Sequence, residues 1–246
     1  MKIAFCFLVY DNIIRYDIWN KFFEGCDQDK YKVFIHPKYK NDLVHLNFKF
    51  TMIKNIINTT AKDNITIVKA TLQLLRESYS DDITHYIFVS QSCIPLYSFN
   101  IIYNFLGTIN KSIVSCIMNN KKERYHKLSE TMKKYIKYPY FVKQQPNMIL
   151  INSDVKILIK NDMTEHFKYM QCPDEHYFIN LLLFVMKKEI IKQQINFCNY
   201  NFQCTQAIQF NNVDEIFIRN IRMYGFLFLR KVNIKSKIDI NYLFNN

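Results

Sequence analysis

Two short stretches of the sequence carry side chains suited to group-transfer chemistry. The first, His85–Phe99 (HYIFVSQSCIPLYSF), contains an apolar run, Tyr86–Val89, that ends in small polar residues and a proline. The second, Gln171–Phe178 (QCPDEHYF), places a proline and two acids at the start of an apolar segment. The first stretch predicts a buried strand that opens into a loop at its carboxyl end, where α/β sheets usually bind ligands. The second predicts a helix start that would place a carboxylate, a candidate base, at the rim of the same cleft.

The proline and the acids also have a purely structural interpretation. Pro173 suits the first position of a helix, and Asp174 and Glu175 gain from the positive end of the helix dipole. This pattern is common at helix starts that have no catalytic role. The dipole would lower the pKa of a carboxyl group, so a useful base there needs partial burial against it. His176 is an alternative base, although packing on the helix face is the more ordinary role of such a histidine.

The rest of the chain supplies the elements that must position these groups. Apolar runs typical of buried strands alternate with segments of helical spacing as far as about residue 118. The expected strands are Ile3–Val9, Lys32–His36, His85–Ser90 and Ser112–Met118, and the expected helices are Ile13–Phe23, Ile65–Tyr79 and about 99–106. Such alternation predicts an α/β fold with a mostly parallel central sheet flanked by helices on both faces.

The second half of the chain is less regular. Asn119–Lys143 is polar and basic, which predicts a long loop or an inserted segment. Beyond it we expect strands at Met148–Ile151 and Phe226–Leu229, and helices at Asp154–Ile159 and Pro173–Lys187. No internal repeat, low-complexity tract or clear linker interrupts the sequence, so a single domain over residues 1–246 is the simplest expectation.

Composition narrows the classes to which this protein can belong. Its 246 residues are 49% hydrophobic, which excludes a disordered chain and suits one α/β domain. The net charge of +12 accompanies an excess of Lys, Asn, Ile, Tyr and Phe that is typical of AT-rich coding sequence. A solvated lysine surface is therefore the plainer interpretation of the charge, and attraction to nucleotides, nucleic acid or acidic glycans is the alternative.

The cysteines and the apolar runs indicate a compartment. Seven cysteines without a C-x-x-C pair predict free thiols in a reducing environment, rather than a disulfide framework or a zinc site. No apolar stretch reaches the roughly 18 residues that a membrane span needs. The run Ile3–Tyr10 lacks a following small-residue cleavage site, so it predicts a buried strand rather than a signal peptide. We therefore expect a cytoplasmic protein with no membrane span.

The sequence motifs along the chain resemble those of one family of enzymes. In order the motifs are KIAFCFLVY, IWNKFFEG, KVFIHPK, the helix segment Thr66–Ala70, SQSCIPLYS, KQQ, PDEHYF and FLFLRK. This series resembles the Core-2/I-branching family of glycosyltransferases, which includes β-1,6-N-acetylglucosaminyltransferases, peptide xylosyltransferases and plant relatives. The motifs are most similar to those of the plant branch, and the resemblance covers nearly the whole chain.

The resemblance implies a GT-A-like nucleotide-sugar-binding fold. It places nucleotide binding in about residues 1–118, and acceptor binding with catalysis in about 119–246. It also implies an inverting, metal-independent transfer. The sequence, too, predicts that no metal ion is bound at the motif position. Ser90-Gln91-Ser92 stands where metal-dependent enzymes of this fold carry Asp-x-Asp, and these side chains hold a divalent ion poorly. Asp27-x-Asp29 has the spacing but lies between a helix and a strand, which predicts a turn.

The resemblance also implies roles for charged residues. Glu175 matches the catalytic base that removes the proton of the acceptor hydroxyl. Lys231 matches the family's lysine on the diphosphate, and either Arg222 or Arg219 is the candidate for its arginine partner. A guanidinium fork and an ammonium group together would do the electrostatic work of a metal ion. The alternative is that these cations belong to an ordinary solvated surface beside an edge strand.

Further contacts follow from the same resemblance. Nucleotide contacts are expected at Val9 and Tyr10 beside the uracil, at His36 with Lys38 near the ribose, and at Thr66. Contacts to the donor or acceptor sugar are expected at Ser92, Cys93, Glu123, Arg124, Lys143 and Gln145. Core packing is the alternative explanation for Val9, Tyr10 and Cys93.

The expected partners are a UDP-sugar donor and a glycan or glycoprotein acceptor, with no metal or other cofactor. UDP-N-acetylglucosamine is the leading donor, followed by UDP-xylose and UDP-glucuronic acid. Two other classes stay open. One is a glycosyltransferase-like glycan-binding module without turnover, against which Glu175 and Lys231 argue. The other is a nucleic-acid-binding protein, for which Lys121–Lys137 with Tyr125 and Tyr135 is the candidate surface; we expect no nucleic acid because no recognised motif surrounds it. The AT-rich composition would suit a large DNA virus of protists or a bacterium, with glycosylation in the cytosol.

Overall fold

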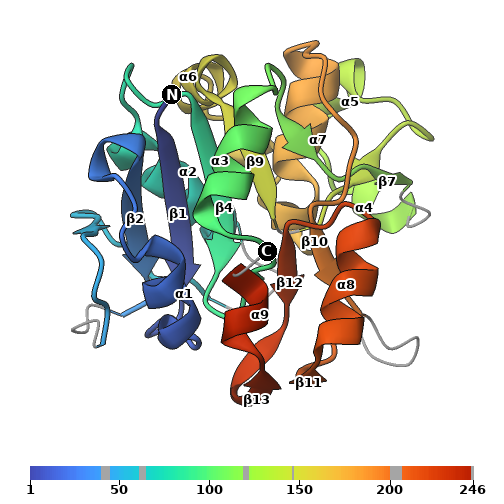
Figure 1. The fold of residues 1–246 in the computed structure, drawn as a ribbon. Coiled ribbons are helices and arrows are strands. Elements are labelled where there is room, and N and C mark those ends of the chain that lie inside the picture. Colours follow the sequence, from blue (N-terminus) through green and yellow to red (C-terminus); the bar gives the residue numbers. More distant parts are fainter. Residues whose placement is uncertain (40–44, 61–64, 119–121, 146, 200–206, 245–246) are drawn as a thin grey trace.

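The computed structural model describes residues 1–39, 45–60, 65–118, 122–145, 147–199 and 207–244. Its main sheet has six strands in the order β3-β2-β1-β4-β9-β6. They are β1 (Ile3–Val9), β2 (Tyr31–Pro37), β3 (Thr51–Met52), β4 (His85–Ser90), β6 (Ile113–Val114) and β9 (Met148–Ile151). The strands β3, β2, β1 and β4 are mutually parallel, whereas β9 pairs antiparallel with both β4 and β6. The expectation of an α/β fold with a mostly parallel central sheet is confirmed (Figure 1).

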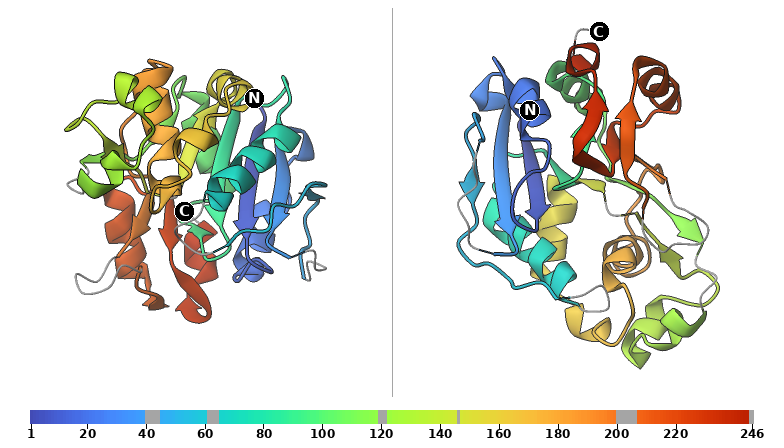
Figure 2. Two further views of the ribbon diagram at one scale, coloured as in Figure 1. Left: turned by 180° about the vertical axis from the view of Figure 1, so that it is seen from behind. Right: turned by 90° about the horizontal axis from the view of Figure 1, so that it is seen from below.

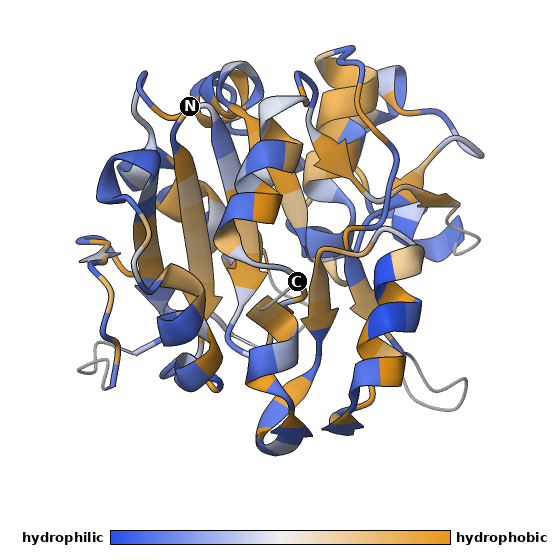
Figure 3. Cartoon of the chain, viewed as in Figure 1, coloured by the Kyte–Doolittle hydropathy of each residue, from blue (hydrophilic) through white to orange (hydrophobic). Residues whose placement is uncertain are grey.

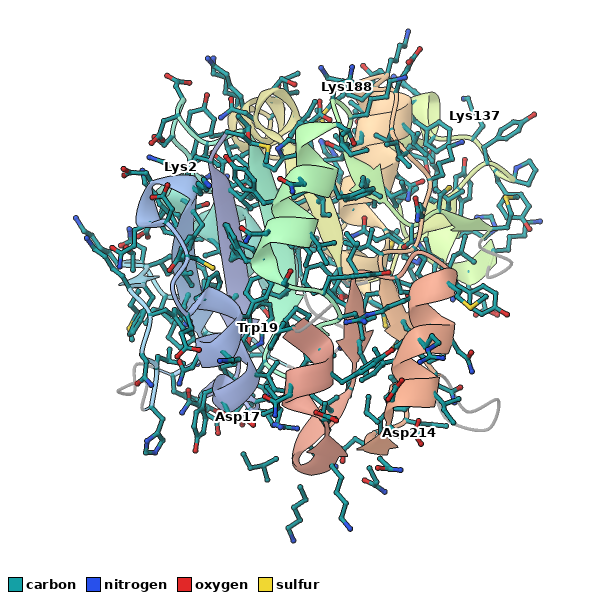
Figure 4. All side chains as sticks on the ribbon, in the orientation of Figure 1. Lys2, Asp17, Trp19, Lys137, Lys188 and Asp214 are labelled. Atoms are coloured by element: carbon teal, nitrogen blue, oxygen red, sulfur yellow. The ribbon has the colours of Figure 1, made fainter. Side chains whose placement is uncertain are left out.

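Helices cover both faces of this sheet (Figures 1 and 2). They are α1 (Tyr16–Phe23), α2 (Thr66–Ser78), α3 (Phe99–Gly107) and α6 (Asn152–Lys160). Alternate residues of β1 point to opposite faces, as the period of a strand requires. Phe5 packs edge-on against Trp19 of α1, which is labelled in Figure 4, whereas Cys6 belongs to the cluster that includes α2 and α6. Because β1 is buried on both sides, it is apolar throughout (Figure 3), and each buried Phe stabilises the fold by roughly 1.5–3 kcal/mol.

A second, smaller layer lies beyond the carboxyl ends of the central strands. Its strands are β5 (Ile94–Pro95), β10 (Asn196–Cys198), β11 (Phe210–Val213), β12 (Phe228–Arg230) and β13 (Val232–Ile238), and its helices are α8 (Glu215–Met223) and α9 (Ile240–Phe244). Asp214, labelled in Figure 4, caps α8 because its carboxylate accepts the Phe217 N–H at 2.9 Å. The backbone N–H of Val232 donates to the carbonyl of Ser92, which joins this layer to the loop after β4.

The remaining elements pack beside β9. They are β7 (Ile117–Met118), β8 (Val142–Lys143), α4 (Lys122–His126), α5 (Glu130–Tyr135), η2 (Thr164–His166), η3 (Pro173–Glu175), α7 (Tyr177–Asn180) and η4 (Leu181–Val185). The segment Pro173–Val185 changes from a 3₁₀ turn to an α-helix and then to a π-helical turn. Such a π-helical turn is rare and frequently accompanies a functional site.

Three expectations about local structure need correction. The strand expected over Ser112–Met118 is two short strands, β6 and β7, because the chain leaves the main sheet and pairs with β8 instead. The expected loop Asn119–Lys143 contains α4, α5 and β8 in its described part; residues 119–121 lie outside the described residues. The expected helix Pro173–Lys187 is the composite helix described above. The turn expected at Asp27-x-Asp29 is confirmed as η1 (Gln28–Lys30), with the Asp29 N–H donating to the Asp27 carboxylate at 2.9 Å.

Two further findings concern the cysteines and the membrane. Cys6, Cys26, Cys93 and Cys116 are free thiols, and Cys204 lies outside the described residues. None of the helices that the structure describes combines the length and apolar character needed to cross a membrane.

Candidate active site

A cavity of about 220 Å³ lies at the carboxyl ends of β1 and β4. Leu8 of β1 and Ser90 of β4 form part of its wall, and Thr71 of α2 forms another part. The chain leaves β1 toward β2 on one side and reaches β4 on the other, so this edge is the topological switch point of the sheet. Ligands of open α/β sheets bind at such points. The right-hand view of Figure 2 looks toward this edge.

Polar groups from distant parts of the chain meet in the same cavity. They are Gln144, Asn147, Asp174 and Arg230. Burial, reinforced by the neighbouring carboxyl of Glu175, raises the pKa of the Asp174 carboxyl to about 6, while the charges of Arg230 and Arg124 act in the opposite direction. The Nε atom of Arg230 is buried without a hydrogen-bond partner in the described part of the chain. The cavity therefore holds one carboxyl and one guanidinium, together with neutral hydrogen-bonding side chains.

The turn that carries the two acids is held in place by hydrogen bonds to β8 and to Gln144, the residue that follows it. The N–H of Gln144 donates to the carbonyl of Glu175 at 2.7 Å, and its side-chain carbonyl accepts the N–H of Ile179 at 2.9 Å. Asn180, which is fully buried, accepts the Val142 N–H and donates to the Val142 carbonyl. These bonds fix the position of the acids relative to the main sheet.

The backbone before the acids is strained. Cys172 has φ = 48°, which is the left-handed region that residues other than glycine rarely adopt. Such strain persists where the surrounding structure determines the conformation, and it is commonest at functional sites. Pro173 then starts the 3₁₀ turn at its first position, as its fixed φ favours.

Glu175 lies beside Asp174 and forms an ion pair at 2.7 Å between its Oε2 and Nη1 of Arg124. The Glu175 side chain is 36% exposed, whereas that of Arg124 is 13% exposed. The carboxylate is therefore oriented by a largely buried guanidinium and is still accessible to a substrate. This brings together two of the residues predicted for the site, Glu175 and Arg124.

His176 is not placed to act as the base. Its Nδ1 lies 2.9 Å from the Val142 carbonyl and its Nε2 lies 3.2 Å from Nη1 of Arg124, so the Nδ1–H tautomer satisfies both contacts. Its ring is fully buried and stacks on Phe141. Burial, reinforced by the charge of Arg124, lowers the pKa of His176 to about 4. The histidine stays neutral and positions the turn, as its packing role predicts.

The residues predicted for the nucleobase lie at the ends of β1 and β2. Val9 is buried, and its carbonyl accepts the N–H of Lys38 at 2.9 Å. Tyr10 is 50% exposed, and its ring meets that of Tyr39 edge to face with centroids 5.3 Å apart. The Lys38 ammonium lies 4.6 Å from the centroid of the Tyr10 ring and 5.1 Å from that of Tyr39. An exposed aromatic surface with a cation is thus available there for a base or a phosphate.

His36 and Thr66 organise loops next to this surface. His36 is fully buried; its Nδ1 contacts the Pro37 carbonyl at 2.9 Å and its Nε2 accepts the N–H of Ile57 at 3.1 Å. Burial lowers the pKa of His36, so the ring is neutral. Thr66 starts α2, and its hydroxyl accepts the N–H of Thr60 at 3.0 Å. Both side chains hold the backbone near the expected ribose position.

The loop after β4 joins the two layers through its backbone. Ser92 is buried and Cys93 is fully buried. The Cys93 carbonyl accepts the indole N–H of Trp19 at 2.9 Å, and its thiol lies 3.1 Å from the Ser90 hydroxyl. The Cys93 side chain therefore supports the cavity wall from behind, and its core-packing interpretation describes it well.

The two arginines predicted for the diphosphate are engaged elsewhere. Arg222 donates to the carbonyls of Leu96 and Leu243 at 2.6 and 3.0 Å, and its guanidinium lies over the ring of Tyr97. Arg219 is exposed and pairs with Glu215 one helical turn away. Neither is among the described residues that line the cavity, because α8 presents them to its own layer and to solvent. The arginine that the structure brings there is Arg230.

The remaining predicted residues lie around the acids. Glu123 is exposed on α4, next to Arg124. Lys143 lies on β8 opposite Ile117. The backbone N–H of Gln145 donates to the Ser115 hydroxyl, while its side-chain carbonyl is buried without a hydrogen-bond partner in the part of the chain that the structure describes. Lys231, whose carbonyl accepts the Phe210 N–H at 2.8 Å, directly follows Arg230.

Sequence reasoning did not place Gln144, Asn147, Asp174 or Arg230 on the wall of a ligand cavity. Periodicity and motif spacing carry no signal for Gln144 or Asn147, because they follow β8 in an irregular segment. Arg230 offered one signal, its position directly before Lys231.

The described residues contain no group of three or more His, Cys, Asp or Glu side chains arranged to hold a metal ion. At the position where an Asp-x-Asp motif would stand, the Gln91 side chain accepts the backbone N–H of Tyr10, and Ser90 lines the cavity. The sequence Ser90-Gln91-Ser92 thus serves to connect β1 with β4.

An open α/β sheet with a polar cavity at its switch point is the architecture of an enzyme or binding protein for nucleotides and sugars. The chain belongs to the Core-2/I-Branching enzyme family, whose model matches residues 3–222. Glycosyltransferase BC10 of rice, Oryza sativa subsp. japonica, is 25% identical over 130 residues. That match covers 51% of this chain and 33% of the rice protein, so the chain spans about a third of this relative's length.

Solved glycosyltransferases are more distantly similar. Galactosyltransferase LgtC, in complex with donor and acceptor sugar analogs, has 13% sequence identity and a TM-score of 0.43, over 75% of this chain and 71% of that chain. The bifunctional glycosyltransferase WbbM has 9% identity and a TM-score of 0.40, over 92% of this chain and 45% of that chain. Because these TM-scores are below 0.5, the likeness carries no argument about the fold, and the α/β architecture is established by the sheet described above.

Proposed function

We propose that this protein is an inverting, metal-independent glycosyltransferase that uses a UDP-sugar. The observation that carries the proposal is the polar cavity at the carboxyl ends of β1 and β4, with the oriented carboxylate of Glu175 next to its wall. Membership of the Core-2/I-Branching enzyme family supports the same reaction class. This proposal includes the activity, the substrates and the partners of the whole protein.

Glu175 is the general base of the proposed mechanism. It takes the proton from the acceptor hydroxyl as that oxygen attacks the anomeric carbon from the side opposite the diphosphate. The new bond to the acceptor oxygen forms as the bond between the anomeric carbon and the phosphate oxygen breaks, and the electron pair leaves on UDP. The ion pair with Arg124 holds the carboxylate in one orientation, which favours proton transfer at a defined position.

Charge on the departing UDP is neutralised by protein cations in this proposal. Lys231 lies in the segment that hydrogen-bonds to the 90–93 loop, close to the carboxyl end of β4. A cation placed where charge develops lowers the barrier in the same way as a bound metal ion. The side chains of Ser90, Gln91 and Ser92 lack the carboxylates that a divalent ion prefers, which supports a metal-independent reaction.

UDP-N-acetylglucosamine is the donor we favour, followed by UDP-xylose and UDP-glucuronic acid. The acceptor is a hydroxyl of a glycan or a protein. The exposed side of Glu175 and the neighbouring α4 with Glu123 and Arg124 form the surface on which the acceptor would lie. Val9, Tyr10 and His36 define the nucleoside end of the donor site.

The test is hydrolysis and transfer of each UDP-sugar by the wild type and by Glu175→Gln, with and without EDTA. We expect one donor to be turned over by the wild type regardless of EDTA. We expect Glu175→Gln to lose about 10²- to 10⁴-fold in rate while it keeps its affinity for UDP. Loss of activity with EDTA contradicts the metal-independent mechanism, and full activity of Glu175→Gln contradicts the base. A wild type that binds UDP-sugars and glycans without turnover is instead the glycan-binding module.

A further inference from the structure

A basic, tyrosine-rich surface lies beside Glu175 and has no role in the mechanism above. It is formed by residues 122–143, which comprise α4, α5 and β8. Seven of these residues are Lys or Arg and two are Glu, so less than a tenth of the chain carries +5 of its net charge of +12. We propose that this basic surface binds a negatively charged glycan chain that carries the acceptor hydroxyl. This inference rests on the proposed function and names the chemical class of its acceptor.

The basic surface offers several cations to a ligand. Four of its lysines are exposed: Lys122, Lys127, Lys134 and Lys137. None of their ammonium groups forms an ion pair with a residue that the structure describes, whereas Lys133 pairs with Glu130 at 2.7 Å. A chain that carries negative charges along its length can contact several of these cations at once, and their combined field attracts it.

Exposed tyrosine rings accompany the lysines. Tyr135, Tyr138 and Tyr140 are 52%, 40% and 65% exposed, so their ring faces are open to a ligand. The Lys122 ammonium lies 5.8 Å from the centroid of the Tyr138 ring. A tyrosine presents an apolar face that can pack against the C–H groups of a sugar ring, and a hydroxyl that can bond to its polar groups. Cations interspersed with such rings suit a sugar chain that carries acidic groups.

Ring contacts join the basic surface to the turn that carries the candidate base. Tyr125 of α4 packs on both Tyr138 and Phe141, with ring centroids 5.6 and 5.8 Å apart. Phe141 in turn stacks on His176, the residue after Glu175, at 4.5 Å. The helices α4 and α5 lie on the opposite side of the molecule from β2 (Figures 1 and 2). An acceptor whose hydroxyl meets Glu175 would therefore lie over this surface, away from the nucleoside end of the donor site.

Arg124 gives an independent indication of a ligand at the inner end of the basic surface. Its Nη1 atom donates to Glu175, but its Nε atom is buried and has no hydrogen-bond partner in the described part of the chain. Buried donors are nearly always satisfied, so this one indicates an oxygen atom supplied by a bound molecule. A guanidinium bonds most strongly to charged oxygens, as in carboxylates and sulfates.

The experiment measures the binding of short, fluorescently labelled ligands by anisotropy, at low and at physiological ionic strength. The negatively charged glycans are an oligogalacturonate, which carries carboxylates, and a heparin oligosaccharide, which carries sulfates. The methyl ester of the oligogalacturonate is the uncharged control. An oligothymidylate of the same charge represents nucleic acid, the other polyanion that a basic surface attracts. The affinity for UDP is measured in parallel by calorimetry.

Two pairs of lysines separate the basic surface from the charge of the whole protein. Lys134→Gln/Lys137→Gln changes the surface, and Lys235→Gln/Lys237→Gln removes two charges from exposed positions on β13. We expect the wild type to bind at least one charged glycan more tightly than the methyl ester, and less tightly as salt is added. The first pair should weaken this binding by about 5-fold or more and leave the affinity for UDP unchanged, while the second stays within about 2-fold of the wild type. Melting temperatures check that each variant is folded.

Tyr140→Ala tests the ring contact. We expect it to weaken glycan binding by about 3-fold or more at both ionic strengths, because packing against a ring does not depend on charge. Tyr224→Ala, at a tyrosine that is 77% exposed on the other layer, is the control and should match the wild type.

Equal losses in the two lysine pairs would assign the binding to net charge and overturn the proposal. It would also be overturned by the absence of binding to either charged glycan, by equally tight binding of the methyl ester, or by a Tyr140→Ala variant that binds like the wild type. Tighter binding of the oligothymidylate through the same lysines would make the partner a nucleic acid instead. In these cases a wild type that binds UDP leaves the proposed function standing. A wild type that binds no UDP compound overturns the proposed function and the acceptor role together.

Discussion

Replacing Asp174 with asparagine should stabilise the protein at neutral and alkaline pH. Burial raises the pKa of this carboxyl from 3.8 to about 6, because the charged form loses its hydration and lies beside Glu175. A difference of about two units between the folded and unfolded states corresponds to about 3 kcal/mol, at about 1.4 kcal/mol per unit. Asparagine has the same shape and no charge, so the variant avoids this cost.

The sign of the effect follows from proton binding. Between the unfolded pKa and the folded pKa, the folded wild type binds more protons at Asp174 than the unfolded chain does. The free energy of unfolding of the wild type therefore falls as the pH rises from about 4 to about 6. Above that range the Asp174 carboxyl causes no further change. The advantage of Asp174→Asn is absent near pH 4 and complete near pH 8.

Urea unfolding of both proteins at about pH 4 and about pH 8 measures this difference. At the higher pH we expect Asp174→Asn to be more stable by up to about 3 kcal/mol, or about 6–12 °C in Tm. Asp154→Asn is the matched control, because that buried carboxylate already accepts from Ser112 at 2.6 Å and pairs with Lys188 at 3.4 Å. We expect the control to be less stable than the wild type by about 1–3 kcal/mol at about pH 8.

Destabilisation of Asp174→Asn at about pH 8, or an equal effect at both pH values, would contradict an uncompensated buried carboxylate at Asp174. Either result would mean that the Asp174 carboxylate has a partner in solution that offsets its burial.

Three further substitutions test individual contacts. Arg124→Gln removes the ion pair that orients Glu175, so kcat/KM for transfer should fall about 10-fold or more while the affinity for UDP measured by calorimetry is unchanged; an equal loss of UDP affinity would contradict this role. Asn180→Ala removes hydrogen bonds to two backbone carbonyls and a backbone N–H, and urea unfolding should show a loss of about 2–4 kcal/mol; a loss below about 0.5 kcal/mol would be inconsistent with a rigid turn. Trp19→Phe removes the 2.9 Å bond to the Cys93 carbonyl and should lower Tm by about 2–10 °C, with unchanged stability as the contrary result.

The central strands were predictable because they combine a long apolar run with a clear end. The strand β1 matches Ile3–Val9 and β4 matches His85–Ser90 to the residue. A parallel strand buried on both faces cannot tolerate polar residues, so its sequence marks its limits. The short strands β6 and β7 were not separable in Ser112–Met118, because a change of pairing partner leaves no trace in the periodicity.

The family resemblance named Glu175 and Arg124 as site residues, and the structure brings them within 2.7 Å of each other. Their roles in a reaction stay predictions. The choice among the arginines was not predictable, because it depends on where α8 and β12 lie in space. The cavity positions of Asp174 and Arg230 result from contacts between distant segments, which no single-sequence pattern records.

Direct titration of UDP into the wild-type protein in the presence of EDTA tests the central claim that the cavity at the carboxyl ends of β1 and β4 is a nucleotide-diphosphate site. The proposal predicts saturable binding with a Kd in the micromolar to low-millimolar range, and weaker binding by Arg230→Gln but not by Arg219→Gln. The absence of any heat or thermal shift at millimolar UDP would contradict the claim. Binding by wild type and Arg230→Gln alike would contradict the location of the diphosphate.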